Sequence, residues 1–318
     1  MAAKTRLLMS VEEAEKNPEK WLEIRRHGIG GSDAGTIMGL NPYRGRLSLW
    51  MEKTGQQEPE DLSKNQFVYW GKKLEPMVAE YFTEVTGKKL RRCGTLQSVE
   101  HPWLLANVDR LVIGENCGVE IKTAGTSKYG QWKDDEIPDA YYAQCQHYML
   151  TTGLSSWWIV ALIGGNDCKI KEVPRNQEFI DELFKAEAGF WSLVENGIMP
   201  DVDGLEDTSK ALSAMYPQAV PESELVLEST DKMEELFRNY SEYKKACKGL
   251  EELITECENK IKVLMGDNTR LKCGEHKASW SNQAGRTTID SKALQAEEPE
   301  IYEKYKKVGK PSRRFSMK

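Results

Sequence analysis

The sequence lacks any apolar run long enough to cross a membrane, and its mean hydropathy is −0.61. The amino terminus continues from Met1 into polar sequence, without the apolar core that a signal peptide requires. These two absences predict a protein of the cytoplasm. Hydrophobic residues make up 39% of the 318 residues and aromatic residues 9%, enough for one large domain and a smaller one.

The chain also lacks the cysteine spacing of a metal centre. Its seven cysteines include no C-x-x-C pair and no tight cluster. An odd number of scattered cysteines suits a reducing compartment, and we expect neither a zinc site nor an iron–sulfur cluster.

An excess of basic residues is absent as well, since 44 Lys and Arg face 50 Asp and Glu for a net charge of −6. That balance is unusual for a protein that binds nucleic acid, because phosphate contacts favour Lys and Arg. Basic runs do occur at Arg25–Arg26 and at 88–92, while much of the acid lies within 222–258. A basic lumen with an acidic exterior would reconcile these facts, although each basic run is equally consistent with a solvated surface.

Two predicted neighbouring strands carry charged residues. Residues 106–113 form one strand, and Glu120, Ile121 and Lys122 lie on the next, after a turn rich in Gly and Asn. The two-residue period of a strand directs Glu120 and Lys122 to one face and Ile121 to the other. If the turn centres near 114–115, Asp109 lies opposite Glu120.

Like charges that face each other across strands are destabilising, so the pairing of Asp109 with Glu120 indicates a cation between them. Mg²⁺ prefers oxygen ligands and commonly takes one or two protein carboxylates plus a substrate phosphate. The alternative is a solvent-facing hairpin in which Glu120 and Lys122 are ordinary surface charges, and an isolated Glu-x-Lys favours that alternative.

A helix precedes these strands and another follows. Apolar residues recur at helical spacing from Leu74 onward, with Gly87 as the stop. Glu75 is predicted to lie in the first turn beside Pro76, either as a partner of the helix dipole or as a further metal ligand.

The second helix runs from Asp139 to Gly153 and places Gln144 and Tyr148 on one face. It could equally be an amphipathic core helix with a glutamine at its edge. The near-continuous apolar segment 156–163 then predicts a strand that is buried on both faces.

The amino-terminal block Arg26–Ala34, with Arg25 just before it, combines two arginines, a pair of glycines and Ser32. Gly30 and Gly31 allow a tight turn, and Ser32 is predicted to cap a helix that starts at Asp33. Such a helix start with adjacent arginines can hold a phosphate, or it can be a simple capped helix beside two solvated arginines.

In this order, the blocks of residues 20–200 resemble the PD-(D/E)xK nuclease core, a central mixed sheet flanked by helices in the restriction-endonuclease-like α/β class. Arg26–Ala34 and Gly39–Tyr43 make the chain similar to the phage-type alkaline exonucleases of the YqaJ viral recombinase family, relatives of lambda exonuclease. The chain departs from the pattern at Val108, which stands where the family has proline.

The resemblance implies Mg²⁺-dependent hydrolysis of DNA, with one or two ions and with Mn²⁺ as a substitute. Asp109, Glu120 and the Ile121 carbonyl would bind metal, and Glu75 would complete a second site. Lys122 would orient or deprotonate the attacking water and stabilise the transition state. Gln144 would position the reacting groups and Tyr148 would support the site, so that the catalytic set is as follows: Glu75, Asp109, Glu120, Lys122, Gln144 and Tyr148.

The resemblance also implies a substrate and an assembly. Arg26 and Ser32 would hold the 5′-phosphate at a double-stranded DNA end, with Arg25 as the alternative arginine. Digestion would run 5′ to 3′ and leave a 3′ overhang for a single-strand annealing protein, RecT-like or Beta-like, in recombination by single-strand annealing. A homo-oligomer, the trimeric ring of the family, and a phage or prophage gene expressed in a bacterial cytoplasm are further expectations.

Two competing functions remain open. A structure-specific or restriction-like endonuclease would use the same core, because the chemistry does not encode the choice of an end or an internal bond. A non-catalytic recombination scaffold that binds DNA would need none of Asp109, Glu120 and Lys122.

The carboxy-terminal part has a different pattern. A helix at 176–196 is predicted to finish the core (1–199), and 200–226 reads as a connecting segment with a short helix near 209–215. Residues 227–318 form an α-rich extension. Within it apolar residues recur in heptads, which predicts a long helix that pairs within the chain, with itself or with a partner: Met233, Leu236, Tyr240, Tyr243, Cys247, Leu250, Ile254, Cys257, Ile261 and Leu264.

The heptad helix is predicted to stop at Gly266–Asp267. A small hairpin at 269–281 and a helix at 291–306 follow, and 313–317 is a candidate terminal strand.

Overall fold

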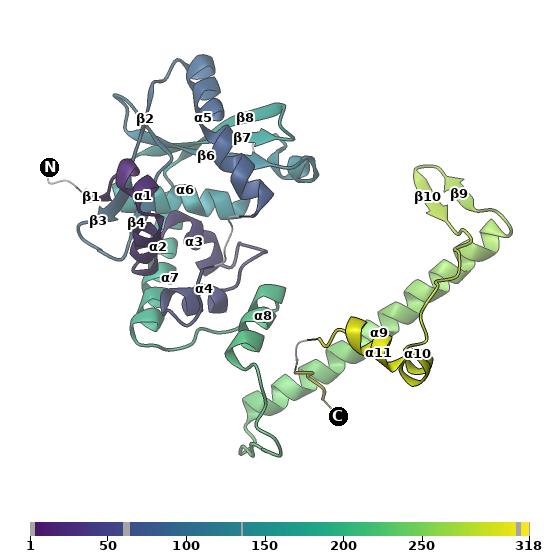
Figure 1. The fold of residues 1–318 in the computed structure, drawn as a ribbon. Coiled ribbons are helices and arrows are strands. Elements are labelled where there is room, and N and C mark those ends of the chain that lie inside the picture. The colour runs from purple at the N-terminus through teal and green to yellow at the C-terminus, as the bar shows by residue number, and fades with distance from the viewer. Residues whose placement is uncertain (1–3, 60–63, 135, 310–312, 318) are drawn as a thin grey trace. The chain divides into compact units, whose positions relative to one another are not determined.

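The computed structural model describes residues 4–59, 64–134, 136–309 and 313–317 (Figure 1). The chain divides into two compact units, Met1–Pro217 and Gln218–Lys318. None of the helices in the described residues combines the length and apolar character that crossing a membrane requires.

The first unit contains a five-stranded sheet in the order β2-β5-β6-β7-β8 and a three-stranded antiparallel sheet in the order β1-β3-β4. In the larger sheet β6 and β7 are parallel and the other neighbours antiparallel. The strands are β1 (Thr5–Met9), β2 (Leu90–Arg92), β3 (Thr95–Ser98), β4 (Leu105–Asn107), β5 (Arg110–Val112), β6 (Cys117–Ala124), β7 (Ser156–Ile163) and β8 (Asp167–Pro174).

Helices cover both faces of the larger sheet (Figure 1). The helices of the first unit are α1 (Val11–Lys16), α2 (Pro18–Arg26), α3 (Gly31–Ile37), α4 (Arg46–Lys53), α5 (Gln66–Thr86), the 3-10 helix η1 (Thr126–Trp132), α6 (Asp139–Thr152), α7 (Gln177–Glu195) and α8 (Glu206–Met215). Val119 and Ile121 of β6 pack with α5, and Met149 of α6 packs against Trp157 and Ile159 of β7 on the other face. The predicted mixed sheet flanked by helices is confirmed.

The central strands confirm two predictions from sequence patterns. Ile121 belongs to the apolar cluster under α5, whereas Glu120 and Lys122 bond to Gln144 of α6. In β7, Ile159 and Val160 are both completely buried although they point to opposite faces. A strand between two sheet neighbours and two helix layers needs apolar residues on both sides, which explains the absence of alternation.

Three local predictions for the first unit were wrong. Residues 106–113 are not one strand, because the chain leaves the smaller sheet after Asn107 and enters the larger one at Arg110. Glu75 does not lie in a first turn, since α5 begins at Gln66, capped by the Asn65 side chain, and Pro76 lies inside the helix. The α5 end at Gly87 agrees with the prediction, with φ of 71°.

The cap of α3 is the third difference. Gly30, not Ser32, is the N-cap residue, and the Asp33 carboxylate accepts the Gly30 N–H at 3.0 Å. Asp33 is buried, and its other partner is the ammonium of Lys53 at 2.8 Å. Burial alone would raise the pKa of Asp33, but Lys53, with Arg25 and Arg44, holds it below its usual range.

The second unit is built on α9 (Asp231–Met265), a single helix of 35 residues that ends at Gly266. The predicted hairpin is present as β9 (Arg270–Cys273) and β10 (His276–Ser279). The predicted helix at 291–306 is instead two helices, α10 (Ser291–Glu297) and α11 (Pro299–Tyr305). Pro299 has no N–H to continue α10 but is suited to begin a helix. Residues 313–317 do not form the terminal strand we expected.

Candidate active site

Asp109 lies where the chain passes from one sheet to the other. The register of β5 on β6 pairs Arg110 with Val119, and its continuation sets Asp109 opposite Glu120, as predicted. The Asp109 carboxylate accepts the backbone N–H of Ile121 at 2.8 Å. This bond takes the place of a regular ladder contact and fixes the carboxylate at the edge of β6.

A continuous set of hydrogen bonds joins β6 to α6. Oε1 of Glu120 accepts from the Gln144 amide at 2.8 Å and from the Lys122 ammonium at 2.6 Å. Lys122 also donates to the Gln144 carbonyl oxygen at 2.9 Å. The Gln144 amide contacts the Tyr148 hydroxyl at 2.9 Å, and that hydroxyl donates to the Asn107 carbonyl at 2.9 Å. The helical spacing of Gln144 and Tyr148 thus directs both side chains toward the strands, where they form hydrogen bonds with residues of β6 and β4.

Burial and neighbouring charges shift the pKa values of Asp109 and Lys122 in this cluster. Burial, and then the nearby negative charge of Glu120, raise the pKa of Asp109 well above its ordinary value. Burial opposes the charged form of Lys122, but Glu120 and Asp109 outweigh it and raise the pKa of Lys122. The side chain of Lys122 therefore presents an ammonium to two carboxylates, and it also lies 4.7 Å from the ring centroid of Tyr141.

The donor set fits a hard cation. Oε2 of Glu120 is buried without a hydrogen-bond partner in the described part of the chain, and buried carboxylate oxygens are normally paired. Together with Asp109 and the Ile121 carbonyl it offers three oxygens of the type that Mg²⁺ prefers. Within the described residues, no group of three or more His, Cys, Asp and Glu side chains could hold a metal, so the predicted set of three carboxylates is not gathered in this structure.

Glu75 lies at the border of this cluster and is held by Arg110. The Glu75 carboxylate accepts from the guanidinium of Arg110 at 2.6 Å, and the same guanidinium nitrogen donates to the Asp109 carbonyl at 2.7 Å. Arg110 is 8% exposed and connects the partly buried Glu75 carboxylate to the backbone of Asp109. Arg110 was not among the residues predicted from the sequence, although its position beside Asp109 was the available signal.

The amino-terminal arginines have different partners from those expected. Arg26 pairs with Glu58 at 2.6 Å, whereas Arg25 donates to the Ser32 hydroxyl at 3.1 Å. The Arg25 guanidinium also lies over the Trp21 ring, 4.8 Å from its centroid. Ser32 therefore has Arg25, the alternative residue, as its basic neighbour.

Gly31 joins this amino-terminal block to the α6 side chains. A Cβ added to Gly31 would lie 2.5 Å from Cε1 of Tyr148 and 3.1 Å from Cγ of Gln144. Real Cβ atoms do not approach other atoms so closely, so the first turn of α3 can contact α6 here through glycine alone. Ser32 and Arg25 are thereby positioned next to the helix that orients Glu120 and Lys122.

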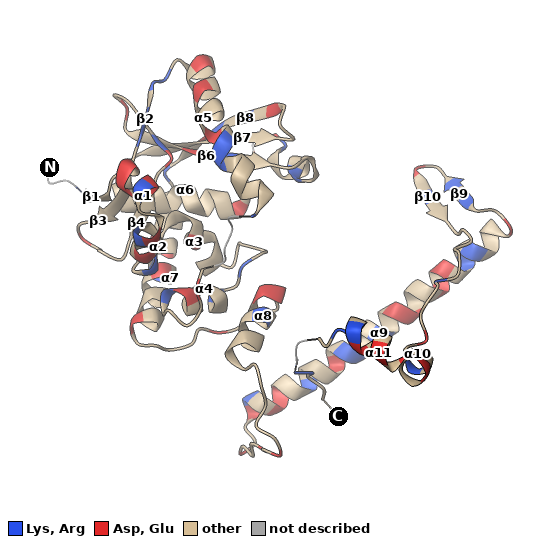
Figure 2. Ribbon diagram, viewed as in Figure 1, with Lys and Arg blue, Asp and Glu red and all other residues tan. Residues whose placement is uncertain are grey.

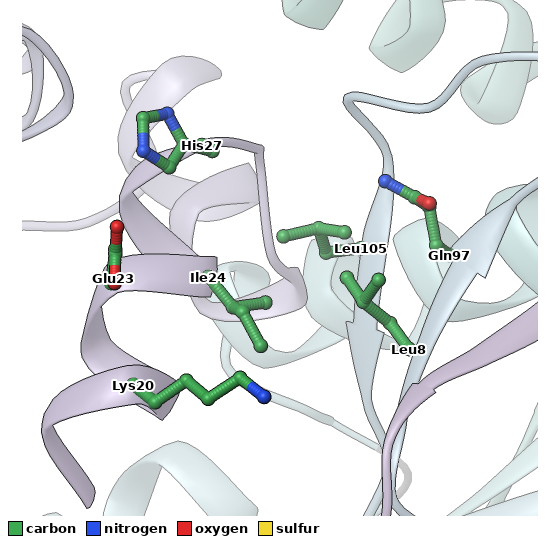
Figure 3. Close-up of a pocket in the computed structure, with 7 residues that line it drawn as sticks. All are labelled: Leu8, Lys20, Glu23, Ile24, His27, Gln97 and Leu105. Carbon is green, nitrogen blue, oxygen red and sulfur yellow. The ribbon is translucent and has the colours of Figure 1, made fainter.

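A hollow of about 290 Å³ lies elsewhere in the first unit (Figure 3). Three of its residues, Lys20, Glu23 and Ile24, come from α2, and His27 directly follows that helix. Leu8, Gln97 and Leu105 come from β1, β3 and β4. It contains none of the predicted catalytic side chains, so its chemistry is separate from the cluster at β6.

Comparison with known proteins gives the family. The model of the YqaJ-like viral recombinase domain matches residues 20–155. The YqaJ protein of Bacillus subtilis (strain 168) is 37% identical over 309 residues, which cover 96% of this chain and 95% of that protein. Protein R354 of Acanthamoeba polyphaga mimivirus is 21% identical over 55% of this chain and 33% of its own length.

The fold has a solved counterpart. An alkaline exonuclease from Laribacter hongkongensis matches with a TM-score of 0.50 and 21% identity, over 57% of this chain and 94% of that one. That likeness supports the predicted nuclease-like core, and the match to the Bacillus protein extends over both units. The chain therefore belongs to the YqaJ-like viral recombinase family.

Proposed function

We propose that this chain is a Mg²⁺-dependent exonuclease that digests linear double-stranded DNA from 5′ to 3′ and leaves 3′ single-stranded overhangs. The observation that carries the proposal is the buried cluster of Asp109, Glu120 and Lys122, with its unpartnered Glu120 oxygen. The similarity of the fold to an alkaline exonuclease supports the choice of reaction.

Asp109, Glu120 and the Ile121 carbonyl would hold the ion, and Glu75 would serve a second one after release from Arg110. When bound, Mg²⁺ supplies charge that stabilises the phosphoryl oxygens and lowers the pKa of attacking water. Mn²⁺ has similar ligand preferences and is expected to substitute.

The protein's own groups would act on the scissile phosphate from one side. The Lys122 ammonium is held by Glu120 and Gln144 and can donate to a phosphate oxygen as negative charge develops there. Gln144 fixes the orientation of both charged side chains, and Tyr148 fixes Gln144. Because each group is already bonded in place, little reorganisation accompanies the reaction.

End recognition would use the start of α3, which lies against Tyr148 and Gln144 of α6. Arg25 and Ser32 together offer a guanidinium and a hydroxyl, which suit a terminal phosphate. In this proposal Arg25 takes the role that the sequence assigned to Arg26. A ring of three copies would keep the enzyme on its DNA, and a single-strand annealing protein would take up the 3′ overhang.

The test uses linear duplex DNA labelled at either the 5′ or the 3′ end, with Mg²⁺ or EDTA. We expect 5′-labelled mononucleotides to appear first with the wild type and Mg²⁺, and no product in EDTA. Asp109→Ala should abolish cleavage. Lys122→Met should lower the rate at least 100-fold, because the group that stabilises charge in the transition state is lost.

A 5′-hydroxyl end tests the phosphate site. Arg25→Ala should reduce the preference for 5′-phosphorylated ends, while Arg26→Ala, the matched control, should retain it. Release of the 3′ label first would contradict the polarity, and cutting of closed circular duplex DNA would indicate an endonuclease. If Mg²⁺ produces no cleavage and Lys122→Met changes nothing, the chain is a DNA-binding scaffold instead.

A further inference from the structure

The long helix of the second unit carries an apolar stripe that remains open to solvent. Along α9, residues with the spacing of heptad a and d positions include Leu236, Tyr243, Leu250, Ile254 and Leu264, which are 66%, 65%, 59%, 59% and 74% exposed. Tyr240 of the same stripe contacts the Phe315 ring, at a centroid separation of 5.8 Å. A sustained stripe of this kind is suited to pair with another helix.

The charges of α9 are arranged in four successive blocks, and Figure 2 shows both signs along this helix. Residues 231–237 contain three acids and one base, and residues 238–248 contain four bases and one acid. Residues 249–259 contain four acids and no base, and residues 260–265 contain two bases and no acid. The signs of the blocks are therefore negative, positive, negative and positive.

We propose that α9 pairs antiparallel with α9 of a second copy of this chain. When two such helices overlap over their full length in opposite directions, block 231–237 meets 260–265 and block 238–248 meets 249–259, so each block faces one of opposite sign. A parallel pair would instead set each block against its own copy. Flanking charges choose orientation in this way in paired helices.

The flanks of the stripe favour the same orientation. In the heptad, Lys244, Glu251 and Glu258 share one flank, and the antiparallel overlap sets Lys244 between Glu251 and Glu258 of the second copy. The opposite flank carries Ala246 and Leu253, which would extend the apolar contact across the pair. A parallel pair would set residues 239, 246 and 253 against 244, 251 and 258, which brings no opposite charges together.

Side-chain size gives a further independent argument. The antiparallel overlap places Tyr240 opposite Cys257 and Tyr243 opposite Ile254 of the second copy. Each layer then combines a large residue with a smaller one, as close packing requires. A parallel pair would set two tyrosines against each other at both positions.

The first experiment measures the mass of the full chain by sedimentation equilibrium. Leu250→Glu places a charge in the middle of the stripe at an exposed position, and we expect the mass at a given concentration to fall twofold. If the nuclease unit also assembles by itself, that assembly persists in Leu250→Glu, and the wild type still has twice the mass of the variant. An unchanged mass would overturn the proposal.

Exchange of charges tests complementarity without altering the apolar stripe. Lys244→Glu with Lys245→Glu should weaken the pair at least tenfold, and adding Glu251→Lys with Glu252→Lys should restore it. Lys292→Glu on α10 is the control and should have no effect. If the fourfold variant pairs no better than the twofold one, charge does not set the orientation.

Disulfide formation tests orientation directly, in protein in which Cys247→Ser and Cys273→Ser remove the other exposed thiols of the described residues. Tyr240→Cys should then give a covalent dimer through Cys257 when oxidised. Adding Cys257→Ser should abolish that dimer, because the two positions 240 lie far apart in an antiparallel pair. A dimer that persists without Cys257 would indicate parallel pairing and overturn the proposal.

Discussion

Replacement of Gly31 by alanine tests the contact between the amino-terminal block and α6. The added methyl would lie 2.5 Å and 2.7 Å from two ring atoms of Tyr148, so the ring must move. Its hydroxyl bonds with Asn107 and Gln144, both 2.9 Å long, would then stretch or break. The substitution thus combines overpacking with the loss of buried hydrogen bonds.

The magnitude follows from these two effects. Overpacking costs about 1–3 kcal/mol and an unsatisfied buried polar group about 1–3 kcal/mol, so we expect a loss of roughly 2–6 kcal/mol. For a unit of this size, that loss lowers the Tm by roughly 5–15 °C. Cleavage should fall with it, since Gln144 positions both Glu120 and Lys122.

Calorimetry on the full chain and cleavage of end-labelled DNA would measure the two effects. Gly189→Ala is the matched control, because nothing lies within 4 Å of the added methyl in the middle of α7. It should raise stability by about 0.5–1 kcal/mol. Combining Gly31→Ala with Tyr148→Leu should recover part of the lost stability. If Gly31→Ala lowers stability and cleavage no more than the control does, α3 and α6 are not in close contact at Gly31.

Three further predictions concern buried charge. Asp109→Asn keeps an oxygen that accepts the Ile121 N–H, so the variant should fold normally in EDTA. It should lose cleavage, and thermal melts should show that Mg²⁺ no longer raises its Tm. Burial opposes the charged form of the His147 ring, but Glu187 outweighs it and raises the pKa of His147 above the ordinary value. The ion pair of His147 with Glu187 therefore stabilises the fold fully below about pH 6.5, and this contribution is lost as pH rises through the higher pKa of the folded state. Melts between pH 6 and 9 should show that decline in the wild type and not in His147→Gln. Lys53→Met removes the nearest cation of the buried Asp33 and leaves the longer pair with Arg44 at 3.9 Å. It should cost about 3–5 kcal/mol in urea unfolding, part of which Asp33→Asn restores.

The sequence predicted the relations that depend on a local period. The two-residue period of β6 placed Glu120 and Lys122 on the face opposite Ile121, and the helical period of α6 placed Gln144 and Tyr148 together. These patterns hold because each element buries one defined face against a neighbour. The position of a residue in the element therefore determines the direction in which its side chain points.

Relations between elements were harder to predict. The chain changes sheets at Asp109, but residues 106–113 have one continuous strand pattern that contains no sign of the change. The start of α5 was placed too late because Gly71 and Pro76 resemble signals for a helix start. In the structure Gly71 lies inside α5, where an added Cβ would be in ordinary van der Waals contact with Oγ1 of Thr123 on β6, at 3.4 Å.

The choice between Arg25 and Arg26 shows the same limit more sharply. Adjacent residues of a helix point about 100° apart, so only one of the two can face Ser32. Which one does so depends on how α2 docks on α3, and the hydrogen bond from Arg25 to Ser32 is a contact between these two helices. The residue types in this block were therefore predictable, whereas the pairing required the packed structure.

The packed structure also explains why end recognition and cleavage would be coupled. Ser32 follows directly after Gly31, and Gly31 lies against the ring of Tyr148, whose hydroxyl bonds with Gln144. Gln144 in turn bonds with both Glu120 and Lys122. A phosphate bound to Ser32 would displace Gly31 and Tyr148, and through Gln144 it would shift the side chains of Glu120 and Lys122. No movement of a whole domain is needed. In our proposal, a DNA end that fails to fill the Arg25–Ser32 site would therefore be cleaved slowly even when its scissile bond reaches Lys122.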